Sequence, residues 1–356
     1  MRQYRIFIKD SLNLTSRPVS TVLCPAFTVK RDLLGSASST FSPLEIDSNV
    51  KEGDILGLID PYGTILYTGV IKSIGDNIQT QQMMYLFNDR WKWYDPADLT
   101  IEGKIKTILE AEYTQSSDPM VAARFPYTVS TTSSTTGTFE QHTVTVGGQE
   151  VPSQKYTTDL MRFLFDLYDQ WGVIVDVHVP YENVAPTITI GQATGSSVKI
   201  GNNVNPITDM TALTEIFETN RLFIYNKDGD TLRATYYGTT GGITNDPDDP
   251  LRLPVTKTRY VFDTDKDLDE IVSEHLQEEM LNHKLEFSML LDNNLYQFFD
   301  WNLGQQIEIW FNGNYYSTLF TGYTFRKQDG SDLSSVDIVC GKVRNTLTDI
   351  LNRGIE

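Results

Sequence analysis

The chain has 356 residues and a formal net charge of −18 at pH 7, from 47 Asp and Glu against 29 Lys and Arg. This length exceeds the size at which one hydrophobic core stops growing, so roughly two to four domains are expected. No stretch gathers basic residues, which disfavours tight nucleic-acid binding. The same acidity suits an ordinary soluble protein, or the wall of a channel that repels DNA and lets it slide.

Cysteine usage and hydropathy exclude several other classes. The two cysteines, Cys24 and Cys340, lack CxxC spacing, so we expect packed thiols rather than a disulfide framework or a zinc site. The N-terminal sequence MRQYRIFIKD has no apolar region typical of a signal peptide, and no apolar run approaches roughly 18 residues. The sequence therefore predicts a protein made soluble in a cytoplasm.

Residues 1–96 predict a small antiparallel β-barrel or sandwich. Period-2 alternation and β-branched or aromatic content indicate strands, which are punctuated by Gly53 and by turns at 61–63 and 75–77. The expected strands are 4–8, 44–46, 55–59, 65–74 and 82–87.

Residues 97–250 predict a mixed α/β region, in which helices alternate with strands. Thr100 is a candidate N-cap for a helix carrying Ile101, Ile105, Ile108 and Leu109. The Ser/Thr/Gly-rich stretch near 128–138 cannot bury enough apolar surface for a core, so we interpret it as a mobile loop. The remaining elements expected are helices at 157–170 and around Leu213, Ile216 and Phe217, strands at 173–179, 221–225 and 232–237, and a loop at 241–250.

Residues 251–356 predict a late helix followed by a second β-domain. The helix at 265–282, preceded by Asp263 as a candidate N-cap, places its apolar residues on one face. Asn312-Gly313 and Asp329-Gly330 are dipeptides that hairpin turns prefer. The expected strands are 285–291, 306–311, 315–326 and 333–340, with a terminal helix at 343–351.

One hairpin signature occurs twice. GDILGLIDPYGTILYTGV begins at Gly53, and GQQIEIWFNGNYYSTLFTGY begins at Gly304. Their matching ends, Tyr67-Thr68-Gly69 and Phe320-Thr321-Gly322, lie 253 residues apart (322 minus 69). This spacing is too long for a solenoid and favours two similar β-domains, which in turn favours a ring or tube.

A search for catalytic and ligand-binding groups finds no site. His142, His178, His275 and His283 lack the spacing of a metal site, and no esterase, P-loop or dinucleotide motif occurs. We therefore predict no catalytic, cofactor-binding or metal-binding residues and no cofactor. A glycosidase is harder to exclude, because its carboxylates come from distant positions.

Two local features leave alternatives open. The acidic run 245–249 offers oxygen ligands for Ca²⁺ but lacks EF-hand order, so a solvated turn is the favoured interpretation. The aromatics Trp91, Trp93 and Tyr94 could stack on a sugar or a base, although packing between domains is the favoured interpretation.

Taken together, several segments resemble the siphophage tail-hub family, the tail-associated lysin or baseplate-closing proteins related to the central hub of contractile phage baseplates. The resemblance covers nearly the whole chain. It rests on these segments: GDILGLIDPYGTILYTGVIKSI, TIEGKIKTILEAEYTQSSDP, HKLEFSMLLDNNL, the second hairpin, and GKVRNTLTDILN.

The resemblance implies a β-rich α+β fold, with two tube-like antiparallel β-barrel domains flanking and packed with mixed α/β insert domains. It implies a non-enzymatic homotrimer at the virion tail tip, which closes the tail tube and opens for DNA ejection. The implied partners are the distal tail protein hexamer, the tape-measure protein, passing DNA, receptor-binding proteins and the host envelope. Many relatives carry a lytic or fibre extension, whereas this chain stops at Glu356, so lysis is not implied. A carbohydrate-binding adsorption module and a cell-wall hydrolase are the alternative hypotheses.

Overall fold

The computed structural model describes most of the chain. The described residues are 3–33, 35, 37–87, 90–92, 96–137, 143–146, 149–152, 156–192, 198–201, 206–214, 221–226, 229, 231–239, 242–252, 258–262, 267–272, 276, 283–293 and 295–341. The chain divides into two compact units: residues 1–208 with 288–338, and residues 209–287 with 339–356. Within the described residues, no helix has the length and apolarity needed to cross a membrane.

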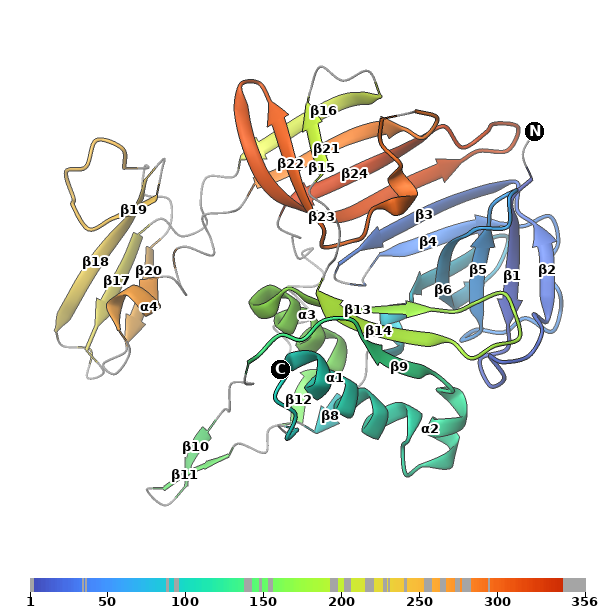
Figure 1. Ribbon diagram of the computed structural model, residues 1–356, viewed down its shortest axis with the longest axis horizontal. Helices are drawn as coiled ribbons and strands as arrows, with labels where there is room; N and C mark the ends of the chain where they lie inside the picture. Colours follow the sequence, from blue (N-terminus) through green and yellow to red (C-terminus); the bar gives the residue numbers. More distant parts are fainter. Residues whose placement is uncertain are drawn as a thin grey trace. The chain divides into compact units, whose positions relative to one another are not determined.

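β-strands dominate the described part of the chain (Figure 1). The strands of its first half are β1 Arg5–Lys9, β2 Ser20–Leu23, β3 Ala26–Asp32, β4 Ser38–Ser42, β5 Ile55–Ile59, β6 Ile65–Ile74, β7 Ile78–Gln82, β8 Arg90–Lys92, β9 Thr128–Thr131, β10 Thr143–Val146, β11 Gln149–Pro152, β12 Tyr156–Asp159 and β13 Val173–His178. Those that follow are β14 Thr187–Gln192, β15 Val198–Gly201, β16 Ile207–Thr214, β17 Arg221–Tyr225, β18 Leu232–Thr239, β19 Gly242–Thr244, β20 Thr258–Phe262, β21 His283–Leu290, β22 Gln306–Phe311, β23 Asn314–Lys327 and β24 Ser335–Gly341.

Helices are few in the part of the chain that the structure describes. They are α1 Ile101–Leu109, α2 Pro119–Arg124, α3 Leu160–Trp171 and α4 Leu268–Val272, with one-turn 3₁₀ or π segments at Met83–Phe87, Glu110–Thr114 and Phe298–Asp300. Thr100 caps α1 as predicted, because its hydroxyl accepts a hydrogen bond from the Gly103 amide at 3.1 Å. The β-rich α+β class expected from the sequence is confirmed.

The largest sheet contains two copies of one strand order. Its main path runs β16-β21-β24-β23-β3-β4-β7-β6-β5-β1-β2, with β22 beside β23 and β15 beside β22. The order β3-β4-β7-β6-β5-β1 thus repeats as β16-β21-β24-β23-β22-β15. The copies differ at one end, because β1 is antiparallel to β5 whereas β15 is parallel to β22. Among the described strands this path is open at β16 and β2, so barrel closure stays a prediction.

Strand β3 joins the two copies. It pairs with β4 of its own copy, from Ala26 opposite Ser42, and with β23 of the second copy, from Gly322 opposite Asp32. Val29 and Phe325, which face each other across this junction, are buried. Strands near the two ends of the sequence therefore belong to one sheet.

A second layer in the first unit consists of the sheet β13-β14-β9 with α1 and α3 packed against it (Figure 1). Burial of one apolar stripe from each helix explains the arrangement, since Ile105 of α1 and Leu164 of α3 share a core with Val177 and Ile190 of the sheet. The predicted helices at 100–109 and 157–170 and the predicted strand at 173–179 are confirmed, each within a few residues.

The second unit has its own small core. Its sheet runs β19-β18-β17-β20, and α4 covers the face that carries Leu222 and Ile224 (Figure 1). Leu222, Ile224, Ile271, Val272 and Leu276 form this core. The predicted strands at 221–225 and 232–237 are confirmed, and the helix predicted at 265–282 is described only in part, as α4.

Several local predictions are wrong. Residues 44–46 are not a strand, because the strand ends at Ser42 before Pro43, which has no backbone N–H to donate. The strand expected at 82–87 is instead the end of β7 and a 3₁₀ turn, and Leu213 lies in strand β16 rather than in a helix. Residues 215–220 and the predicted terminal helix at 343–351 lie outside the described residues.

The Ser/Thr segment also differs from a simple loop. Thr128–Thr131 form strand β9, with Val129 buried, and Thr132 N donates to Ile190 O at 2.9 Å. Ser and Thr hydroxyls and backbone groups here form hydrogen bonds in place of apolar contacts. The mobility of the segment stays a prediction.

Candidate functional site

The turn that leads into each hairpin is held by the same hydrogen bonds in both copies. Gly53 and Gly304 each have a positive φ, 91° and 83°, and each is followed by a buried polar residue, Asp54 or Gln305. Three hydrogen bonds within the turn have an equivalent in the other copy. They are Val50 N to Asp47 O (3.1 Å) and Trp301 N to Phe298 O (3.0 Å); Lys51 N to Asp54 Oδ2 (2.9 Å) and Asn302 N to Gln305 Oε1 (3.1 Å); and Asp54 N to Lys51 O (3.2 Å) and Gln305 N to Asn302 O (3.0 Å). Two hydrogen bonds across the hairpin are also equivalent: Gly53 N to Ile71 O (2.8 Å) and Gly304 N to Phe320 O (2.7 Å), and Ile71 N to Asp54 O and Phe320 N to Gln305 O (both 2.8 Å).

These contacts correct the alignment of the two sequence repeats. The offset between copies is 251 residues on the first strand of the hairpin (304 minus 53) and 249 on the second strand (320 minus 71), because the first hairpin is two residues longer at its tip. Tyr67 therefore corresponds to Tyr316, its counterpart in the β-ladder, and the match with Phe320 made by sequence is four residues out of register. The duplication itself is present in strand order and in hydrogen bonding.

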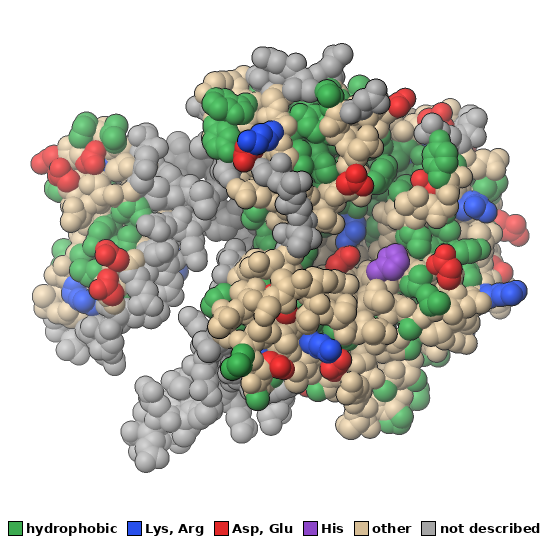
Figure 2. All heavy atoms as spheres, in the orientation of Figure 1, with side chains coloured by type: hydrophobic (Ala, Val, Ile, Leu, Met, Phe, Trp, Pro, Cys, Tyr) green, Lys and Arg blue, Asp and Glu red, His purple; other side chains and the backbone are tan. Residues whose placement is uncertain are grey.

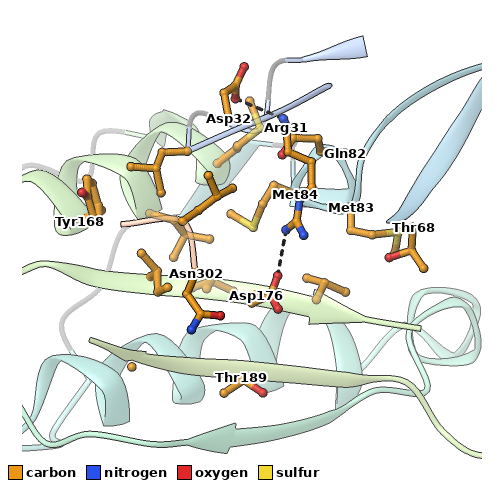
Figure 3. A pocket seen from close by; sticks show the side chains of 18 of the residues that line it. Arg31, Asp32, Thr68, Gln82, Met83, Met84, Tyr168, Asp176, Thr189 and Asn302 are labelled. Atoms are coloured by element: carbon orange, nitrogen blue, oxygen red, sulfur yellow. Dashed lines mark hydrogen bonds and ion pairs between the residues drawn. The ribbon is translucent and has the colours of Figure 1, made fainter. Parts of the chain in front are cut away.

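The first unit contains a cavity of about 340 Å³ beside the second turn. Its wall comes from β3 and β7, from β13 and β14, from α3, and from residues 301–303 that precede β22 (Figure 3). Met83, Met84 and Met161 supply much of the apolar wall. Of the lining side chains that the structure describes, three are charged: Arg31, Asp32 and Asp176.

Arg31 connects three parts of the fold across this cavity. It lies on β3, directly opposite Tyr323 of β23, and its Nη2 donates to Asp176 Oδ1 of β13 at 3.2 Å (Figure 3). The Arg31 side chain is 33% exposed and that of Asp176 is 57% exposed. An ion pair this accessible to solvent contributes no more than about 1 kcal/mol to stability. A competing solute can therefore reach and break it.

The pKa shifts leave Arg31 charged and Tyr323 neutral. Burial alone would lower the pKa of Arg31, but the side chains of Tyr323 and Asp176 together raise it. Burial raises the pKa of Tyr323, and the nearby Arg31 only partly offsets this effect. Tyr323 also stacks on Phe325, with ring centroids 5.7 Å apart and an interplanar angle of 9°, which holds its ring in place.

The sequence pointed to none of these three residues. β3 was not predicted, although Phe27 and Val29 alternate with polar residues and give a period-2 signal. No local signal could pair Arg31 with Asp176, because 145 residues separate them. Long-range pairing of this kind depends on the fold.

The histidines and acidic residues weighed from sequence do not assemble into a site in the described part of the chain. His178 lies on β13 and is exposed, His283 begins β21, and His142 and His275 fall outside the described residues. In the acidic run 245–249, Asp246 and Asp249 accept hydrogen bonds from the nearby amides of Asp248 and Leu251. No group of three or more potential metal ligands occurs among the residues described.

The aromatic residues give a clearer surface in the second unit than at the predicted position. Trp91 lies in β8, whereas Trp93 and Tyr94 fall outside the described residues. On the sheet of the second unit, Tyr260 and Phe262 are 55% and 58% exposed. They stack on Phe223 and Tyr225 respectively, each pair with centroids 5.5 Å apart.

Comparisons of structure identify the fold. No protein-family model matches the sequence. No curated protein matches it either. The tail protein from Neisseria meningitidis MC58 matches with 12% identity and a TM-score of 0.56, over 95% of this chain and 96% of that chain.

Two further solved structures agree with this match. The 43 kDa tail protein of prophage MuSo2 from Shewanella oneidensis has 12% identity and a TM-score of 0.57, over 95% of this chain and 97% of its own. A chain of the p2 virion baseplate in its activated conformation has 12% identity and a TM-score of 0.50, over 96% and 100%. The chain therefore has the fold of phage tail and baseplate proteins, as the resemblance found in the sequence implied.

Proposed function

We propose that the chain is a structural protein of a phage tail tip. In this proposal it forms a homotrimeric hub that closes the end of the tail tube, docks the distal tail protein ring and opens for DNA ejection. The observation that carries the proposal is the repeated β-module, supported by the likeness of the fold to phage tail proteins. Three chains with two modules each provide six similar modules, which suits a sixfold tube.

The finer features of the proposal follow from this arrangement. Each module closes into a tube-like β-barrel in the assembly. The expected domain bounds 1–96, 97–250 and 251–356 then change at one point, because β15 and β16, at 198–214, belong to the second module. The partners are the distal tail protein hexamer, the tape-measure protein, receptor-binding proteins and the host envelope. The wall passes DNA without reading its sequence, and on the face shown in Figure 2 basic side chains do not gather into one patch.

Light scattering on the purified chain tests the assembly. The proposal predicts a trimer of three 40.4 kDa chains, about 121 kDa, either alone or after addition of the distal tail protein. The second condition matters because the neighbouring ring can be what drives trimerisation. A 40.4 kDa monomer under both conditions contradicts the proposal.

We propose further that the chain is not an enzyme. The described wall of the cavity holds two carboxylates and one guanidinium, and Asp176 pairs with Arg31. Zymography on purified host cell walls decides against the hydrolase alternative if no cleared zone forms. A cleared zone would require a catalytic role for acidic residues of this chain.

A carbohydrate-binding adsorption module is the second candidate. The exposed Tyr260 and Phe262 favour it, because aromatic rings open to solvent can stack against sugar rings. Binding to host wall polysaccharide that is lost in Y260A/F262A, and kept in Y62A, supports this function. Tyr62 is a suitable control because it is 76% exposed on another surface. Equal binding by all three proteins removes the support.

A further inference from the structure

We propose that the cavity beside Arg31 is a binding site for an arginine side chain of a partner protein. The bound guanidinium would form an ion pair with Asp176 in place of Arg31. The identity of that partner as another tail protein rests on the proposed function. The preference of the cavity for a guanidinium does not, and it can be measured separately.

The size of the cavity limits what can enter. Ligand pockets typically range from roughly 300 to 1,000 Å³, so about 340 Å³ is enough for one long side chain but not for a helix or strand. More than half of the described lining residues are apolar or aromatic, namely methionine, leucine, isoleucine, valine, tryptophan and tyrosine. Such a wall suits the methylene stem of a long side chain that ends in a polar group.

Charge selects a cation. Among the described lining residues are two carboxylates, Asp32 and Asp176, and one guanidinium, Arg31, which gives these residues a formal charge of −1. Tyr323 stays neutral, because its pKa is raised. The whole chain carries −18, which also favours approach of a basic partner.

Asp176 has an unused acceptor for that cation. Its Oδ1 accepts from Arg31, and no residue in the described part of the chain donates to its Oδ2. At 57% exposure the carboxylate is open to solutes, and Figure 3 shows it pointing toward Arg31 across the cavity. A planar guanidinium fits this group better than an ammonium does, because it donates two parallel hydrogen bonds and stacks on aromatic rings such as Trp301.

Binding of such a group has a structural consequence. Arg31 links β3 of the large sheet to β13 of the second layer through Asp176. An incoming guanidinium that takes over Asp176 removes this link. Partner binding at the cavity would thus remove this one contact between β13 and β3.

Titration of the full-length protein with Nα-acetyl-arginine methylamide, followed by two-dimensional NMR, tests the proposal. Nα-acetyl-citrulline methylamide, a neutral isostere, is the matched ligand control. We expect saturable shifts of β3 and β13 resonances with the arginine probe, and affinity at least about tenfold weaker with citrulline. Equal affinity for both probes, or no saturable binding to the folded protein, overturns the proposal.

Two variants separate binding from structural damage. D176N should weaken arginine binding by about tenfold or more, whereas R31Q should strengthen it, because the internal competitor is gone. A purely structural role predicts that both variants lose binding together, and that result contradicts the proposal. D337N is the control, since Asp337 pairs with Arg326 at 3.8 Å outside the cavity lining and its loss should leave the affinity unchanged. Trimer formation is measured in a separate experiment. If the protein does not form a trimer, the proposed function fails, and the arginine titration still decides whether the cavity binds a guanidinium.

Discussion

Gly53 and Gly304 show how single residues set the repeated turn. Both have a φ in the positive region that residues with a Cβ rarely adopt, and both amides donate across the hairpin. The positive φ therefore explains why each sequence repeat begins with a glycine. Sequence comparison found these glycines without showing what they do.

Replacing Gly53 with Ala should destabilise the protein by about 1–2 kcal/mol through backbone strain. Nothing lies within 4 Å of a Cβ built at this position, so a steric clash would not explain the loss. Chemical denaturation measures the effect. Gly75→Ala is the matched control, because that site is equally open and its φ is not in the positive region. Equal stability of the two variants would falsify the role given to φ.

The cysteines make a second prediction at this scale. Burial raises the pKa of the Cys24 thiol to about 12 and also raises that of Cys340. Both are buried and free, as the sequence predicted. A thiol reagent at pH 8 should label neither residue in the folded protein and both after denaturation. Rapid labelling of either thiol in the native state contradicts this.

Among the elements, the segment from β9 to Gly137 is the one that was predicted least well from the sequence. Glu102 of α1 is fully buried and accepts from Ser133 Oγ at 2.6 Å, Thr135 N at 2.7 Å and Thr135 Oγ1 at 2.8 Å. A single carboxylate thus fixes the polar segment to the helix. The polar composition predicted a loop here. Composition alone does not show that the hydroxyls of this segment will reach a buried acceptor.

Changing Glu102 to Gln should cost about 1–3 kcal/mol at pH 7, because an amide nitrogen would then face donors. Burial by itself would raise the pKa of Glu102, but the hydrogen bonds from Ser133 and Thr135 lower it overall. Since the folded pKa is depressed, the stabilisation is complete above the unfolded value near about 4.3 and is lost as pH falls through the folded pKa. Denaturation at pH 7 and at pH 3 should show the difference between wild type and E102Q shrink.

E110Q is the control, because Glu110 is half-buried and pairs with Lys106 at 3.8 Å within the same helical stretch, so its charge should contribute little. Hydrogen exchange adds a local readout. The Thr135 amide should exchange much faster in E102Q than in wild type. A Thr135 amide that already exchanges freely in wild type would show instead that the mobile-loop interpretation was right.

Whether an element could be predicted depends on how far apart in the sequence its interacting residues lie. Hairpins and amphipathic helices such as β22-β23 and α1 depend on alternation, caps and turn dipeptides, and all of these are local. The pair formed by Arg31 and Asp176 depends on residues far apart in the sequence, and so does the pairing of β3 with β23, although the alternation within β3 is local. Those features were accordingly missed, although the family resemblance still indicated the fold.

At the scale of the whole molecule, the first unit needs segments from both ends of the chain. A fragment of residues 1–96 would lose β23, which covers one edge of β3, and would lose α1 and α3, which share a core with Ile55 and Val70. We expect this fragment to aggregate, because an unpaired strand edge and an apolar surface would be exposed. Circular dichroism and light scattering check the outcome, and a soluble, cooperatively folding monomer would favour an independent domain at 1–96.

The central claim is that two copies of one β-module per chain build a ring from three chains. Electron microscopy of the assembled protein, alone or on the distal tail ring, tests it most directly. The account predicts threefold symmetry, with the hairpins β5-β6 and β22-β23 in similar positions around one axis and six such hairpins in all. A particle in which only one hairpin of each chain faces the axis, or in which the chains form no closed ring, contradicts it.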